Sequence, residues 1–195
     1  MPLFTVLVKS YQRPWLLRIA LESVHHFWPR DRYDYRIVVA DDGTEDDLWT
    51  LAGERFGDLW DHAVHGLAGL AKWPMCRAGR FDLVVPTCGA TWNEAVQHCQ
   101  GDAIFLLEDD SYLSSFCDPL TATRLLADKP ILCLIGLEER CRADVPANPM
   151  APRISDDAGQ AWALLQGGWF FSFDGVFYRR GIHDRIGRWP EGVPT

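Results

Sequence analysis

Apolar residues near the N-terminus occur in two blocks of different period. Residues 3–8 form a short apolar run that ends in the polar turn of residues 9–13, a pattern that predicts a buried strand. Pro14 then opens a repeat of apolar residues close to 3.6, which predicts a helix that continues to Phe27.

The same order recurs immediately downstream. Residues 35–40 are rich in β-branched side chains and predict a second strand, and residues 45–56 predict a second helix with Thr44 or Asp42 as its N-cap. Two successive strand–loop–helix units indicate a parallel sheet with right-handed crossovers. We therefore expect an α/β fold with a mainly parallel, Rossmann-like sheet flanked by helices.

The rest of the chain continues this alternation with longer connections. Residues 58–80 contain glycines and a proline and predict a loop-rich segment, and residues 140–157 predict a second, proline-rich loop. Further strands are predicted over residues 81–85, 103–107, 131–135 and 169–173, and further helices over 91–99, 116–127 and 175–186.

Composition narrows the class of protein. The chain has 195 residues, of which 48% are hydrophobic and 24% charged, so a single folded domain is expected. The net charge of -8 leaves no basic surplus to bind a nucleic-acid backbone. No apolar run reaches the ~20 residues of a membrane span, and the six scattered cysteines are typical of reduced, buried thiols. We expect a cytoplasmic protein.

Carboxylates follow two of the predicted strands. Asp41 and Asp42 come after residues 35–40, and Glu108, Asp109 and Asp110 come after residues 103–107. Ligands of open α/β sheets bind outside the carboxyl ends of the strands, and adjacent carboxylates repel one another unless a cation neutralises them. This arrangement predicts a site for Mg²⁺ or Mn²⁺ and a diphosphate at Asp110. The alternative is that these acids are solvated loop residues that cap helices.

These segments carry a family resemblance. Residues 6–14 resemble an opening strand with an S-Y-N-R-P turn, and residues 37–44 resemble the motif I-V-V-D-D-G-S. Asn93, Gly101 and residues 103–110 resemble an N…G…F-L-D-x-D block, and residues 168–187 resemble the strand and helix of an acceptor side. Together they resemble the GT-A-fold glycosyltransferases, most closely the inverting family 2.

The resemblance implies a role for each strand-end residue. Asp42, together with Asp41, would hold the base of a nucleotide-sugar donor, and Lys9 and Ser10 would lie beside the same nucleotide. Asp109 would meet the ribose. The metal ion, Mn²⁺ or Mg²⁺, would bind at Asp110. A UDP-sugar is the expected donor, and a carbohydrate or another hydroxyl compound the expected acceptor.

The resemblance also divides the chain into two parts. Residues 1–110 would form the nucleotide-binding half and residues 111–195 the acceptor-side half of one catalytic domain. Inverting transfer needs a base that deprotonates the acceptor hydroxyl. Glu191 is the only carboxylate after Gly187. We expect the base to lie beyond Thr195, in a domain truncated at its C-terminus, with Glu191 as the candidate within the sequence.

Two rival functions stay open. A nucleotidyltransferase also uses Mg²⁺ held by aspartate, but residues 9–13 lack the glycine-rich, basic signature that such enzymes show after their first strand. A non-catalytic module that retains the nucleotide site is the other rival, and the apparent lack of a base favours it.

Overall fold

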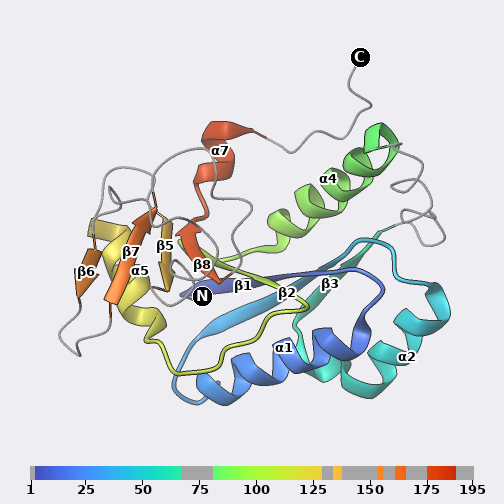
Figure 1. The fold of residues 1–195 in the computed structure, drawn as a ribbon, viewed down its shortest axis with the longest axis horizontal. Helices are drawn as coiled ribbons and strands as arrows, with labels where there is room; N and C mark the ends of the chain where they lie inside the picture. The colour runs from blue at the N-terminus through green and yellow to red at the C-terminus, as the bar shows by residue number, and fades with distance from the viewer. Residues whose placement is uncertain are drawn as a thin grey trace.

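The described strands form one mixed sheet in the order β3-β2-β1-β4-β8-β5-β7-β6 (Figure 1). The computed structural model describes residues 3–66, 81–128, 134–137, 153–155, 161–165 and 175–187. The parallel part of the sheet comprises β3 (His62–His65), β2 (Tyr35–Asp41), β1 (Phe4–Ser10) and β4 (Ala103–Glu108). The antiparallel strands β8 (Val176–Arg179), β5 (Leu134–Leu137), β7 (Ala161–Leu165) and β6 (Arg153–Ser155) extend it.

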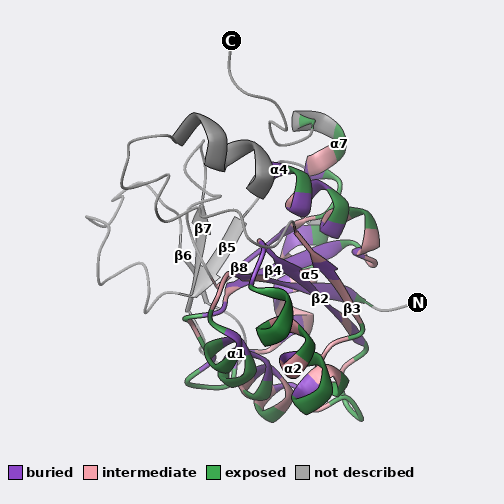
Figure 2. Cartoon of the chain, turned by 90° about the vertical axis from the view of Figure 1, so that its right-hand side faces the viewer, coloured by how far each residue is buried: buried purple, intermediate pink, exposed green. Residues whose placement is uncertain are grey.

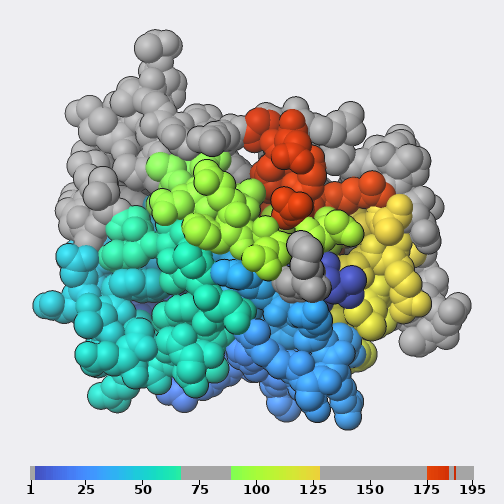
Figure 3. Space-filling model, turned by 180° about the vertical axis from the view of Figure 1, so that it is seen from behind, coloured from blue at the N-terminus to red at the C-terminus, as the bar shows by residue number. Residues whose placement is uncertain are grey.

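Helices cover both faces of this sheet. One face carries α1 (Pro14–Phe27), α2 (Asp46–Phe56) and α5 (Pro119–Asp128), and the short helix η1 (Gly57–Leu59) follows α2. The other face carries α4 (Phe81–His98) and α7 (Ile182–Ile186). Seen from behind, the described part of α4 lies beside the β8–α7 segment (Figure 3). The predicted α/β class is therefore confirmed.

Side chains of the central strands alternate between two hydrophobic cores. Phe4, Val6 and Val8 of β1 face α1, whereas Leu7 faces α4, as the two-residue period of a strand requires. All four side chains are fully buried, and the outer faces of α1 and α2 are exposed (Figure 2). Burial on both faces explains why β1 and β4 read as continuous apolar runs.

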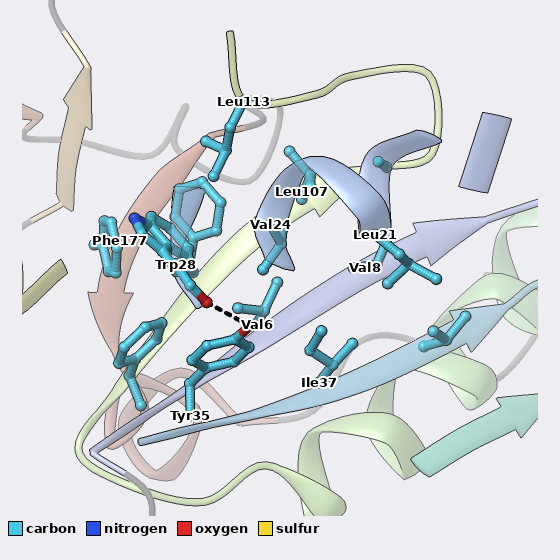
Figure 4. Close-up of a cluster of buried hydrophobic side chains, with 14 of the residues drawn as sticks. Val6, Val8, Leu21, Val24, Trp28, Tyr35, Ile37, Leu107, Leu113 and Phe177 are labelled. Carbon is cyan, nitrogen blue, oxygen red and sulfur yellow. Dashed lines mark hydrogen bonds between the residues drawn. The ribbon is translucent and has the colours of Figure 1, made fainter. Parts of the chain in front are cut away.

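Aromatic residues fix the end of α1 against the sheet. The Trp28 indole donates a hydrogen bond to the backbone oxygen of Cys117 (2.7 Å), and the Tyr35 hydroxyl donates one to the backbone oxygen of Trp28 (2.8 Å; Figure 4). Each polar end of these buried rings thus has a partner, as burial demands. The contacts tie α1 to β2 and to the segment before α5.

Most predicted elements of the parallel half are present. The strands at residues 3–8, 35–40 and 103–107 and the first helix are confirmed. The second helix begins at Asp46, and its N-cap residue is Glu45, which makes no capping side-chain hydrogen bond, so the prediction of Thr44 or Asp42 as the cap is wrong.

Three other predictions need correction. Residues 81–85 are not a strand but the start of α4, because a short apolar run does not distinguish a strand from a buried helix. The predicted loop at 58–80 overlaps η1 and contains the strand β3. The four residues of β3 include two histidines and carry little apolar signal. The predicted helix at 175–186 is the strand β8 followed by the short α7.

The remaining predictions are met in part. The helix expected at 116–127 begins at Pro119, the strand expected at 131–135 is described from Leu134, and the loop expected at 140–157 contains β6. The predicted strand at 169–173 lies outside the described residues.

Two global expectations concern membranes and thiols. In the part of the chain that is described, no helix has the length and apolar character of a membrane span. Cys99 and Cys117 are free and buried, and burial raises the pKa of each thiol to about 12. The side chains of the other four cysteines lie outside the described residues.

Candidate functional site

The four parallel strands end at one edge of the sheet. In the strand register, Ser10 lies beside Asp41, Lys9 beside Glu108, and Asp41 beside His65. Both acidic clusters therefore lie at the same edge of the sheet. We call this group of strand ends the carboxyl edge.

Asp109 joins the end of β4 to the turn after β1. Its Oδ2 accepts hydrogen bonds from the Ser10 hydroxyl (3.1 Å) and from the Tyr11 backbone N–H (3.0 Å). Only 1% of its side chain is exposed. Burial raises the pKa of Asp109 above its ordinary value, although the Tyr11 N–H, the Arg13 charge and the Ser10 hydroxyl oppose this effect.

Two basic side chains neutralise the acidic triplet. The Arg13 guanidinium contacts Asp109 Oδ1 (2.6 Å) and Asp110 Oδ2 (2.7 Å), and the Lys9 ammonium pairs with Glu108. Lys9 also lies 4.6 Å from the centre of the Trp92 ring, within the range of a cation–π contact. Adjacent carboxylates at a strand end thus coexist because arginine and lysine lie among them.

Asp41 has a different environment from its neighbour Asp42. The Asp41 carboxylate is fully buried and accepts hydrogen bonds from the Thr44 hydroxyl (2.6 Å) and the Thr44 N–H (2.8 Å), with His65 Nδ1 at 2.9 Å. Asp42 is half-buried. Asp41 therefore organises the turn after β2, and Asp42 is the more exposed residue of the pair.

The turn after β1 is strained and tied to the turn after β2. Gln12 has a φ of 54°, which is uncommon for a residue with a side chain, and its N–H donates to the Thr44 hydroxyl (2.8 Å). A Cβ at Gly66 would lie 2.7 Å from Thr91 Oγ1 and 3.1 Å from the Asp41 carbonyl oxygen. Close backbone approach at Gly66 and strain at Gln12 mark a tightly built edge.

The carboxylates meet part of the requirement of a hard divalent ion. Asp110 and Glu108 offer oxygen ligands on side chains that are 44% and 36% exposed. Within the described segments, no group of three or more His, Cys, Asp or Glu side chains is arranged to hold a metal ion. Mg²⁺ in phosphate-transfer sites is commonly held by one or two carboxylates and by substrate phosphates, and the residues present fit a site of that kind.

The predicted donor-site residues occupy a single region of the fold. Lys9, Ser10, Asp41, Asp42, Asp109 and Asp110 all lie at the carboxyl edge. Glu191 lies outside the described residues. Sequence reasoning gave no separate role to Arg13 and passed over His65, because Arg13 stood inside a turn motif and His65 inside a predicted loop. Their partners, Asp110 and Asp41, are 97 and 24 residues away.

The fold is shared with solved glycosyltransferases of GT-A type, as the sequence resemblance predicts. The mannosyltransferase PcManGT from Pyrobaculum calidifontis, in complex with GDP-Man and Mn²⁺, matches with a TM-score of 0.55 and 17% identity over 96% of this chain and 47% of that chain. Residues 1–349 of S. aureus TarS match with a TM-score of 0.57 and 16% identity over 99% of this chain and 52% of that chain.

A further match of low sequence identity is a complex with a nucleotide sugar. The S. aureus TarS 1–349 complex with UDP-GlcNAc matches with a TM-score of 0.53 and 15% identity over 94% of this chain and 47% of that chain. No protein-family model and no curated protein matches the sequence. The chain spans about half the length of these solved structures, and at such identities the similarity establishes the fold.

Proposed function

We propose that this protein is a glycosyltransferase that moves a sugar from a nucleotide-diphosphate donor to a hydroxyl acceptor, with inversion. The supporting observation is the gathering of Lys9, Ser10, Asp42, Asp109 and Asp110 at one carboxyl edge. This edge is where ligands of open α/β sheets bind. Solved proteins of the same fold hold GDP-Man, UDP or UDP-GlcNAc, which supports a nucleotide-sugar donor.

The roles follow from the environment of each residue. Asp42 is the proposed partner of the nucleobase, because it is the more exposed residue of the pair after β2. The half-buried Lys9 and the buried Ser10 line the nucleotide's position, and Asp109 fixes the β1 turn beside the ribose. Asp41, whose carboxylate oxygens are bonded to Thr44 and His65, holds the turn that carries Asp42.

A divalent ion, Mn²⁺ or Mg²⁺, is the proposed cofactor. Asp110 would hold it, and Glu108 is a second, partly exposed carboxylate of the same triplet. When bound, such an ion offsets charge on the leaving diphosphate. Lys9 supplies a fixed positive charge at the same edge.

The acceptor side is assigned to the second half of the chain, about residues 111–195, with residues 1–110 as the nucleotide-binding half. Glu191 is the candidate base within this sequence, by the family resemblance. Glu191→Gln should lower transfer by roughly 10²–10⁴-fold if Glu191 is the base. Nucleotide affinity should stay unchanged, because the donor side does not include it. An unchanged rate would place the base elsewhere.

Calorimetric titration with UDP and with GDP tests the donor site. We expect binding that strengthens when Mn²⁺ or Mg²⁺ is added, and we expect Asp110→Asn to remove the effect of the metal. Asp102→Asn is the matched control, because Asp102 is an exposed carboxylate that precedes β4 at the opposite edge of the sheet. If neither nucleotide binds in any condition, the proposal fails.

Release of nucleoside diphosphate in the presence of acceptors distinguishes the rivals. Nucleotide binding without turnover, with every acceptor, would favour a non-catalytic nucleotide-binding module. Release of pyrophosphate from a nucleoside triphosphate would favour a nucleotidyltransferase.

A further inference from the structure

Arg13 bridges the two carboxylates that the proposed function assigns to the ribose and to the metal ion. It is the last residue before α1, and its guanidinium spans Asp109 Oδ1 (2.6 Å) and Asp110 Oδ2 (2.7 Å). Its side chain is 45% exposed, so it lies at the rim of the carboxyl edge and is not locked in the core.

The two carboxylates differ in how firmly they are held. Asp109 is buried and also bonded by Ser10 and by the Tyr11 N–H, so it keeps its place without Arg13. Asp110 is exposed, and Arg13 is the cation that contacts it among the described residues. The contact with Asp110 is therefore the exchangeable one.

A guanidinium and a divalent ion cannot share the same face of one carboxylate. The two cations would repel each other at contact distance, and Asp110 Oδ2 already accepts a hydrogen bond from the Arg13 guanidinium. We propose that Arg13 and the divalent ion are alternative counter-ions of Asp110. Arg13 neutralises Asp110 while no ion is bound. When an ion binds, Arg13 releases Asp110 but keeps its contact with Asp109.

This inference rests on the proposed metal site and gives Arg13 a positioning role that sets metal affinity. Loss of Arg13 removes a competitor and leaves the carboxylate ready. A typical exposed ion pair and the repulsion between the two cations together correspond to roughly 5- to 30-fold in affinity.

The test is a Mn²⁺ titration of the nucleotide-free protein, followed by the electron paramagnetic resonance signal of free Mn²⁺. Arg13→Met should bind Mn²⁺ roughly 5- to 30-fold more tightly than the wild type, and Arg13→Lys should lie between them. Arg18→Met is the matched control, because Arg18 lies on α1 in an exposed pair with Glu22. Equal affinity of Arg13→Met and Arg18→Met would overturn the inference.

Two further measurements complete the test. The first locates the effect at Asp110, and the second uses the wild type, so a folding defect of a variant cannot affect it. Adding Asp110→Asn to Arg13→Met should abolish the gain, and a gain that persists would contradict the inference. In the wild type, Mg²⁺ should shift the guanidinium Nε–H resonance of Arg13 but not that of Arg18. An Arg13 resonance that does not respond while Mg²⁺ binds would also overturn it.

UDP and GDP titrations with a metal chelator report on the proposed function separately. Nucleotide binding together with unchanged Mn²⁺ affinity in Arg13→Met would remove the inference and leave the proposed function standing. Tighter Mn²⁺ binding by Arg13→Met without nucleotide binding would support the inference and remove the proposed function.

Discussion

Neighbouring residues of the carboxyl edge have opposite environments. Asp109 and Asp110 are adjacent, yet the first is 1% and the second 44% exposed. Asp41 and Asp42 form a similar pair, one buried and one half-buried. In each pair one carboxylate organises a turn, and its neighbour is the more exposed residue at the edge where ligands of such sheets bind.

Strain at Gln12 gives a prediction about stability. Its φ of 54° is tolerated better by glycine, so Gln12→Gly should be more stable than Gln12→Ala by about 1 kcal/mol. The alanine variant is the matched control, because it also lacks the glutamine amide but keeps a Cβ and therefore the strain. Urea unfolding of both variants measures the difference. An alanine variant at least as stable as the glycine variant would contradict a strained turn.

The sequence was sufficient to predict the acidic residues of the site but not their partners. A carboxylate after an apolar strand is visible in the pattern, since strand ends share an edge. The pairing of Arg13 with Asp110 joins residues 97 apart and depends on how β1 and β4 align. The burial of Asp41 depends on Thr44 and His65, and β3, which carries His65, was not predicted.

At the scale of elements, two glycines have opposite requirements. A Cβ at Gly101 would lie 2.5 Å from the Leu3 carbonyl oxygen, and its φ is +79°. Gly101→Ala should lower the free energy of unfolding by roughly 2–4 kcal/mol. A Cβ at Gly53, inside α2, would meet nothing within 4 Å. Gly53→Ala should therefore raise stability by about 0.5–1 kcal/mol.

Thermal unfolding of the two variants checks this pair. A destabilised Gly53→Ala would mean that α2 is not a regular helix at that point. A neutral Gly101→Ala would mean that the turn before β4 does not lie against the N-terminal end of β1.

Elements were predictable where periodicity is long and packing is uniform. The strands β1, β2 and β4 are buried on both faces and the helix α1 has an apolar stripe, so each carries its own signal. The apolar residues at 81–85 would suit a strand as well as a helix. Only the continuation of the helix to His98 distinguishes the two. The strand β8 pairs with β4, which lies far upstream in the chain, and local pattern does not register such a contact.

At the scale of the whole molecule, stability should depend on His183 of α7. Burial lowers its pKa to about 4 from 6.5, with Arg180 adding to the effect and Asp184 opposing it, and Nε2 lies 3.1 Å from the Tyr178 hydroxyl. As the pH falls, His183 takes up a proton in the unfolded chain before it does so in the folded protein. The preference of the fold for neutral His183 therefore stabilises it fully above the ordinary pKa. This contribution is lost as the pH falls from 6.5 toward 4.

The expected loss between about pH 7 and about pH 5 is roughly 1–2 kcal/mol, allowing for partial solvent screening. His183→Gln should unfold in urea with a weaker dependence on pH over that interval. His26→Gln is the control, since His26 is exposed on α1. Equal pH dependence of wild type and His183→Gln would show that His183 titrates normally in the folded protein.

The central claim is that a nucleoside diphosphate binds at the carboxyl edge of the parallel strands. Hydrogen–deuterium exchange of the protein with and without UDP or GDP, in the presence of Mg²⁺, tests it most directly. We predict slower exchange in residues 9–13, 41–44 and 108–111, the three turns that this edge brings together. Protection confined to the outer faces of α1 and α2, or no protection in the three turns at saturating nucleotide, would contradict the claim.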